Sequence, residues 1–174
     1  MTTFRRSATR IFALLALFGA LATSTLAQAA RGPSTPDERA RISKLADDSR
    51  KDPLAVQAAN AVWFEQWISA VPDFMFKPEA VAKWCMRAAK GDMKKIVQFQ
   101  FGVGALNYQI KHNLPEPTKA ADMAAVNLAA LDGVLAAYEA LLARDPANRS
   151  PKMDEAIARR NKGELSAFAT ELAQ

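Results

Sequence analysis

The sequence has too few cysteine and histidine residues to build the common catalytic and metal sites. Cys85 is the only cysteine and His112 the only histidine among 174 residues, so no internal disulfide can form. A histidine that acts as a general base or a metal ligand needs partners at fixed spacing, and the sequence supplies none. We therefore expect His112 to lie at a helix end, where the dipole favours it, and Cys85 to be a buried thiol. An exposed Cys85 that forms an intermolecular disulfide is the alternative.

The motifs of several large enzyme classes are also missing. The chain has no Gly-x-Ser-x-Gly elbow and no Ser-x-x-Lys motif. Gly102-Val103-Gly104 lacks the preceding strand and the third glycine of a nucleotide-binding loop, so we interpret these glycines as small residues that let two helices approach. The pattern favours a non-catalytic protein with no cofactor and no bound metal.

Residues 1–29 have the features of a cleaved secretory signal peptide. Three arginines precede an apolar run at Ile11–Leu21, and Ala27-Gln28-Ala29 fits a small-residue cleavage site. The apolar run is shorter than the roughly 20 residues that a membrane-spanning helix needs. We therefore expect an exported protein, periplasmic or extracellular, with no membrane span in the mature chain.

Removal of that segment changes the charge of the chain. The full sequence has a net charge of +5, and the segment carries three basic and no acidic residues, which leaves +2. A nearly balanced chain argues against nucleic acid as the partner. No Ser/Gly-rich linker divides the remainder, so residues 30–174 are predicted to form a single domain. The oligomeric state stays open.

Proline and glycine residues mark where the predicted helices of the mature chain begin and end. Thr35-Pro36-Asp37-Glu38 is a capping box with proline at the first helical position. Residues 99–105 alternate like a strand, but a helical stripe covers more residues there, so we predict a helix. The predicted fold is all-α, a compact bundle of six to seven helices stacked as hairpins, with packing like that of tetratricopeptide repeats. The predicted helices span residues 36–49, 53 to an end at Val71-Pro72, 78–90, 93–112 (capped by Asp92), 120–144, a short segment from 151, and 164–173.

The longest predicted helix, Ala120–Arg144, is expected to be the centre of the bundle. Gly133 lies in its middle, where glycine costs about 1 kcal/mol relative to alanine, and a close helix crossing would offset that cost. Residues spaced by three and four form one apolar stripe, with a second row beside it. The stripe consists of Ala121, Ala124, Leu128, Leu131, Leu135, Tyr138 and Leu142, and the second row of Ala130, Val134, Ala137 and Leu141.

Aromatic residues gather in one part of the chain. They are Trp63, Phe64, Trp67, Phe74 and Phe76. Adjacent helical residues are about 100° apart, so one narrow face cannot cover Trp63, Phe64 and Trp67 together. Either the set lines an apolar groove or interface, or neighbouring helices bury it all. The predicted buried face of this helix consists of Val56, Ala59, Trp63, Trp67 and Ala70.

Three stretches carry a resemblance to a known group of proteins. DPLAVQAANAVWFEQWISAVPDF (residues 52–74), residues 120–149 and KGEL (residues 162–165) resemble an uncharacterised family of small exported bacterial all-α proteins. The resemblance implies export and a helical fold, and it carries over no catalytic residue. The functional prediction is a non-catalytic protein-interaction module. The alternative is a carrier or sensor of a small apolar ligand, bound near Trp63 and Trp67.

Overall fold

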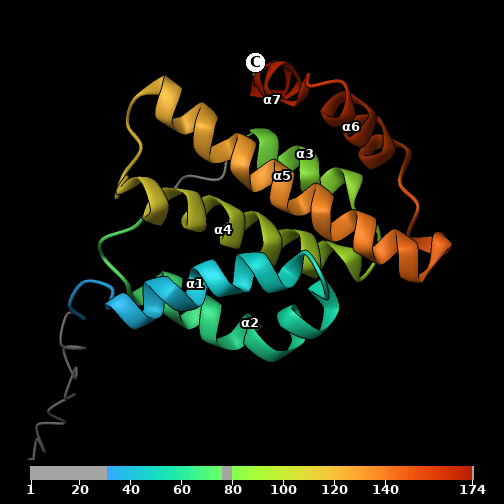
Figure 1. Ribbon diagram of the computed structural model, residues 1–174. Coiled ribbons are helices and arrows are strands. Elements are labelled where there is room, and N and C mark those ends of the chain that lie inside the picture. Colours follow the sequence, from blue (N-terminus) through green and yellow to red (C-terminus); the bar gives the residue numbers. More distant parts are fainter. Residues whose placement is uncertain (1–30, 76–79, 174) are drawn as a thin grey trace, which may run out of the picture. The chain divides into compact units, whose positions relative to one another are not determined.

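The computed structural model describes residues 31–75 and 80–173, and within these ranges it contains helices and no strand (Figure 1). The predicted all-α fold of six to seven helices is therefore confirmed. The predicted signal peptide, the start of the 78–90 helix and Phe76 lie outside the described residues. In chain order the helices are α1 (Pro36–Ser49), α2 (Pro53–Ala70), α3 (Ala80–Ala88), α4 (Met93–His112), α5 (Ala120–Arg144), the 3₁₀ helix η1 (Pro146–Asn148), α6 (Pro151–Asn161) and α7 (Leu165–Ala173).

Side-chain caps explain the starts of α1, α2, η1 and α6. At α1 the Glu38 backbone N–H donates to the Thr35 hydroxyl over 3.2 Å, and the Glu38 carboxylate accepts from the Thr35 N–H over 2.9 Å. The predicted capping box is thus confirmed. The predicted cap at Asp92 is wrong, because the Asp92 side chain makes no capping hydrogen bond and its backbone is already helical, with φ −68° and ψ −18°.

Helices α4 and α5 form the most extensive helix pair, and the other helices pack on either side of it (Figure 1). Helices α1 and α2 lie against α4 on one side, and α3, α6 and α7 cover α5 on the other. Helices adjacent in the chain also contact each other, as in α1–α2 and α6–α7. The segment Ala120–Arg144 is therefore, with α4, one of the two helices at the centre of the bundle.

The predicted apolar stripe of α5 is wrong in its first two turns. Ala121 and Ala124 are exposed, and the first buried residue is Val126. The residues that the sequence placed in a second row are all buried. Neighbouring helices cover the later turns from two sides, so the buried arc is wider than one stripe and includes the second row. These residues are Ala130, Val134, Ala137 and Leu141.

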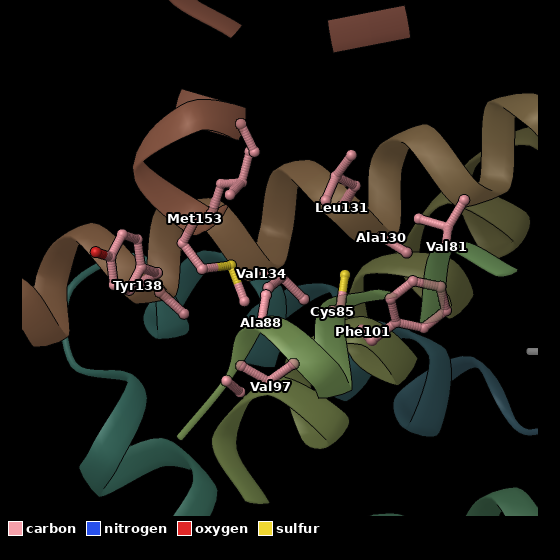
Figure 2. Packing of buried hydrophobic residues seen from close by; sticks show 14 of the residues in the cluster. Val81, Cys85, Ala88, Val97, Phe101, Ala130, Leu131, Val134, Tyr138 and Met153 are labelled. Atoms are coloured by element: carbon pink, nitrogen blue, oxygen red, sulfur yellow. The ribbon is translucent and has the colours of Figure 1, made fainter. Parts of the chain in front are cut away.

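Two apolar clusters form the core, and α4 contributes to both. Phe101 and Ala105 belong to the larger cluster, which α3, α5, α6 and α7 complete (Figure 2). Phe99 and Val103 belong to the smaller cluster, between α4, α1 and α2. Helix α4 is therefore apolar on opposite sides, as expected of a helix in the middle of a bundle.

Of the described helices, α5 is the one long and apolar enough to cross a membrane by length and composition. Half of its most apolar window is buried inside the protein. Leu131 and Leu135, at the middle of that helix, belong to the larger core cluster. The apolar composition of α5 is accounted for by its central place in the bundle.

Candidate functional site

Three of the five predicted groove residues lie in the smaller core cluster. Phe64, Trp67 and Phe74 are buried there beside Ile42 of α1. The ring of Phe64 meets Phe99 edge to face, with centroids 5.1 Å apart. The predicted apolar groove at these residues is wrong, since the packing of α1 and α4 against α2 leaves them almost no accessible surface.

Trp63 is the described member of the set that keeps part of its surface accessible. Its ring stacks on Trp67, with centroids 5.9 Å apart, and the Arg41 guanidinium lies 3.8 Å from its ring centroid. Arg41 also donates to the Asn60 side-chain oxygen over 2.9 Å. Arg41 therefore covers one face of Trp63 in a cation–π contact.

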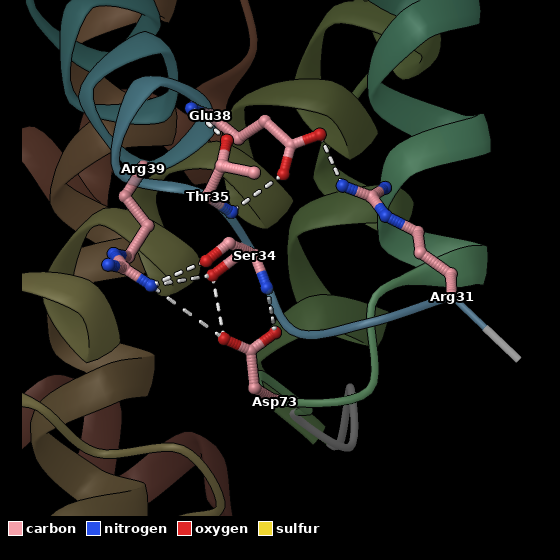
Figure 3. A network of polar contacts seen from close by, with 6 residues as sticks. All are labelled: Arg31, Ser34, Thr35, Glu38, Arg39 and Asp73. Carbon is pink, nitrogen blue, oxygen red and sulfur yellow. Dashed lines mark hydrogen bonds and ion pairs between the residues drawn. The ribbon is translucent and has the colours of Figure 1, made fainter.

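A network of polar contacts anchors the segment before α1 to the loop after α2 (Figure 3). The Ser34 N–H and hydroxyl donate to the two Asp73 carboxylate oxygens over 2.8 and 2.6 Å. Arg39 donates to the Ser34 carbonyl over 2.7 Å, and Arg31 pairs with Glu38. Burial raises the pKa of Asp73, but the hydrogen bonds from Ser34 outweigh it, so the net pKa is lowered. The network has a structural role, holding Asp73 ionised.

The predicted buried face of α2 is wrong at Ala59 and Ala70, which are both exposed. Phe64, which was not assigned to that face, is buried instead. Apolar residues occur all around α2, so periodicity could not identify the buried side.

The outward side of α2 presents an uncovered apolar surface. Leu54 is 41% and Val62 69% exposed, and Ala58 and Glu65 are exposed as well. At about 100° per residue these four positions lie within an arc of about 80°. We call Leu54, Ala58, Val62 and Glu65 the outer face of α2. Figure 1 shows α2 at the edge of the bundle, with α1 and α4 on its inner side. An apolar helix face without a covering element is a candidate interaction surface.

A second candidate is a pair of adjoining depressions along α4 and α5. A groove of about 440 Å³ lies between α5 and α7, and a cleft of about 240 Å³ lies between α1, α4 and α5. They adjoin because Tyr108, Ala129 and Asp132 line both. The groove is mainly apolar, and its other lining residues are Ala125, Leu128, Gly163, Leu165 and Ser166.

The cleft differs from the groove in having polar walls. Arg50 and Asp132 pair across it over 2.9 Å. Gln100 and Asn107 also line it, and the Gln100 Nε2 and Asn107 Oδ1 atoms are buried without a hydrogen-bond partner among the described residues. Unpaired buried polar atoms reduce stability, so this region is less optimally packed than the core on either side.

The residues that could support nucleophilic or metal chemistry are poorly placed for it. Burial raises the pKa of the Cys85 thiol to about 12, so at neutral pH it is protonated and a weak nucleophile. The prediction of a buried thiol is confirmed. His112 lies in the last turn of α4 and stacks on Tyr108, with centroids 4.1 Å apart. Within residues 31–75 and 80–173, no group of three His, Cys, Asp or Glu residues is arranged to hold a metal ion.

Comparisons with known proteins do not extend this description. No protein-family model, curated protein or solved structure matches the chain. The resemblance to exported bacterial helical proteins therefore stays a prediction. The outer face of α2 and the groove between α5 and α7 are the two features of the described residues that can support a functional proposal.

Proposed function

We propose that this protein is an exported, non-catalytic protein-interaction module that binds its partner through the outer face of α2. The observation that carries the proposal is the exposure of Val62 and Leu54 on a helix whose opposite side is packed in the core. Moving an aliphatic side chain from full exposure to full burial contributes roughly 1.5–3 kcal/mol, and Leu54 and Val62 have 41% and 69% of their surface left to bury. A partner that covers both residues would therefore gain appreciable binding energy.

The positions of Cys85 and His112 support a role without covalent chemistry. The Cys85 thiol is buried with a raised pKa, and His112 is in contact with an aromatic ring. The signal-like residues 1–29 support export. Under this proposal the bundle is a rigid support, and α2 supplies the recognition.

A capture experiment with matched variants tests the proposal. The purified mature protein would be immobilised and exposed to periplasmic extract of its own host, in parallel with Val62→Glu. The control is Ala121→Glu, which changes an exposed alanine at the start of α5, across the bundle from α2 (Figure 1). We expect a protein recovered by the parent and by Ala121→Glu to be lost from Val62→Glu. Equal recovery by all three proteins would refute the role of α2.

The groove between α5 and α7 supports a second candidate function, a carrier or sensor of a small apolar ligand. Its volume of about 440 Å³ falls within the roughly 300–1,000 Å³ of small-molecule sites, and Leu128 and Leu165 contribute apolar walls. This position replaces the one predicted beside Trp63 and Trp67, since Trp67 is buried in the core and Arg41 covers one face of Trp63.

Native mass spectrometry of protein purified from its host tests this second candidate. A bound ligand should appear as an extra mass that denaturation removes. Ser166→Trp should eliminate that mass, because Ser166 lines the groove and a large side chain would fill it. Ala167→Trp is the matched control, since Ala167 is the next residue of α7 and is exposed. Retention of the mass by Ser166→Trp would exclude this groove.

A further inference from the structure

We infer that the outer face of α2 binds the same face of a second copy of this chain, antiparallel and around a two-fold axis at Ala58. The inference rests on the proposed function and identifies its partner. The inference is carried by the order of residues along α2, by two exposed charges, Lys51 in the turn before α2 and Glu65 within it, and by the exposure of Leu54 and Val62.

The exposed residues of this face are arranged symmetrically around Ala58. Leu54 lies four residues before it and Val62 four residues after it, and both are exposed. Glu65 lies seven residues after it within α2, and Lys51 seven residues before it, in the turn that leads into α2, and both are exposed. In a two-fold antiparallel pair, each residue meets the one at equal distance on the other side of the axis. Leu54 would then contact Val62 of the second copy, and Lys51 would face Glu65 of the second copy.

The two charges select this register over its neighbour. Neither Lys51 nor Glu65 has an ion-pair partner among the residues that the structure describes, so each is available to a second chain. A shift of four residues, about one helical turn, would place Lys51 opposite Ser69 and Glu65 opposite Ala55. That arrangement loses both ion pairs, and complementary charges at the rim of an interface specify register more than they add affinity.

The size of the side chains suits a close antiparallel pair. Ala58 stands at the axis, with the exposed alanines Ala55 and Ala59 beside it, so the two backbones can approach there. The larger Leu54 and Val62 lie on either side and fill the space above and below the axis. One helix from each copy forms an interface below roughly 1,200 Å² in total, which is typical of weak and reversible association.

Sedimentation of the mature protein over a wide concentration range tests the pairing. We expect the average mass of the parent to rise towards that of a dimer between micromolar and millimolar concentration. Val62→Glu should remain a monomer, because it places two like charges in the interface. Lys51→Glu should weaken the dimer several-fold, and the exchange Lys51→Glu with Glu65→Lys should restore it.

The same experiment can overturn the inference. A parent protein that stays monomeric at millimolar concentration excludes the dimer. If the double variant Lys51→Glu with Glu65→Lys dimerises no more tightly than Lys51→Glu alone, the register is excluded. If the parent is monomeric but Val62→Glu loses a captured periplasmic protein, the proposed function holds and the second-copy inference is wrong. The three mutated positions, Lys51, Val62 and Glu65, are exposed, so circular-dichroism melts should show that the variants fold like the parent.

A disulfide at the axis gives an independent test. Ala58→Cys places one thiol of each copy at the axis. A disulfide between them requires the two Cα atoms to lie within about 7 Å of each other. Native Cys85 does not interfere, since it is buried and its pKa is raised. Gln66→Cys is the control, because Gln66 is an exposed residue of α2 that the register does not place opposite itself. Under mild oxidation, we expect the covalent dimer of Ala58→Cys to form more than tenfold faster than that of Gln66→Cys. Equal rates would contradict the axis.

Discussion

A Cβ atom added to Gly104 would lie 3.0 Å from the Cα atom of Ala130, closer than a side chain can approach a neighbouring backbone without displacing it. The same Cβ would lie 3.1 Å from the Ala129 carbonyl oxygen. At Gly133 an added Cβ would lie 3.7 Å from the Cα of Gly104, which is an ordinary contact. The close helix crossing predicted at Gly133 is therefore present, and Gly104 is the residue whose missing side chain permits it.

The two glycines should respond differently to alanine. We expect Gly104→Ala to lower the free energy of unfolding by about 1–3 kcal/mol, because α4 and α5 must move apart. Gly133→Ala should be neutral or stabilising by up to about 1 kcal/mol, since the methyl group fits and alanine favours the helix. Urea unfolding of both variants measures the difference. Equal effects would mean that the crossing tolerates displacement at Gly104.

Shortening the buried side chains in the middle of α5 should destabilise the protein. Leu131 and Leu135 are both 0% exposed, so Leu131→Ala or Leu135→Ala should cost about 2–5 kcal/mol and lower the melting temperature by several degrees. Asp132→Ala is the control on the same turn, since its carboxylate is partly exposed and pairs with Arg50 and Arg160, and exposed ion pairs contribute about 1 kcal/mol or less each. Leu→Ala variants that melt like the parent would show that α5 is not the centre of the core.

The Ser34–Asp73 network should make the stability of the protein depend on pH in the acidic range. Hydrogen bonds from Ser34 lower the folded-state pKa of Asp73, so its contribution is fully present above the unfolded pKa, about 3.9. That contribution to stability is lost as the pH falls through the lower folded-state pKa of Asp73. Asp73→Asn should therefore be less stable than the parent at neutral pH and show a smaller decline below about pH 4. Parallel stability–pH curves for the two proteins would contradict this assignment.

Tyr138 should stabilise the junction of α5 and α6 through its hydroxyl group. The hydroxyl donates to Asp154 over 2.6 Å and accepts from the Ser150 N–H over 2.9 Å. Tyr138→Phe leaves that buried N–H without a partner, which should cost about 1–3 kcal/mol in chemical denaturation. Tyr108→Phe should change stability little, because no hydrogen bond of the Tyr108 hydroxyl is present among the described residues. Similar losses in both variants would argue against the network.

Cys85 should be inaccessible to thiol reagents in the folded protein. It is fully buried in the larger core cluster, and its raised pKa keeps the thiol protonated near neutral pH (Figure 2). Labelling with a thiol reagent can be followed by mass spectrometry, and we expect it to occur only after denaturant is added. Rapid labelling without denaturant would show an opening of the bundle around α3.

Local chemistry alone determined where α1, α2 and α6 begin. The capping box at Thr35 set the start of α1, and proline at the first helical position marked the starts of α2 and α6. The bounds of α5 were also predictable, because a long apolar period without a breaker continues until Arg144. These signals act over a few residues of the same chain, so they are readable without a fold.

Tertiary packing decided which of those surfaces are buried. Helix α2 is apolar on both sides, and the contact of Phe64 with Phe99 selected the side that faces the core. The groove and the cleft each combine residues of three helices, and Gly104, where α4 and α5 cross closely, lines the cleft. No pattern within one helix encodes such distances between helices. The exposure of Val62, on which the proposed interaction depends, is for the same reason a property of the folded bundle.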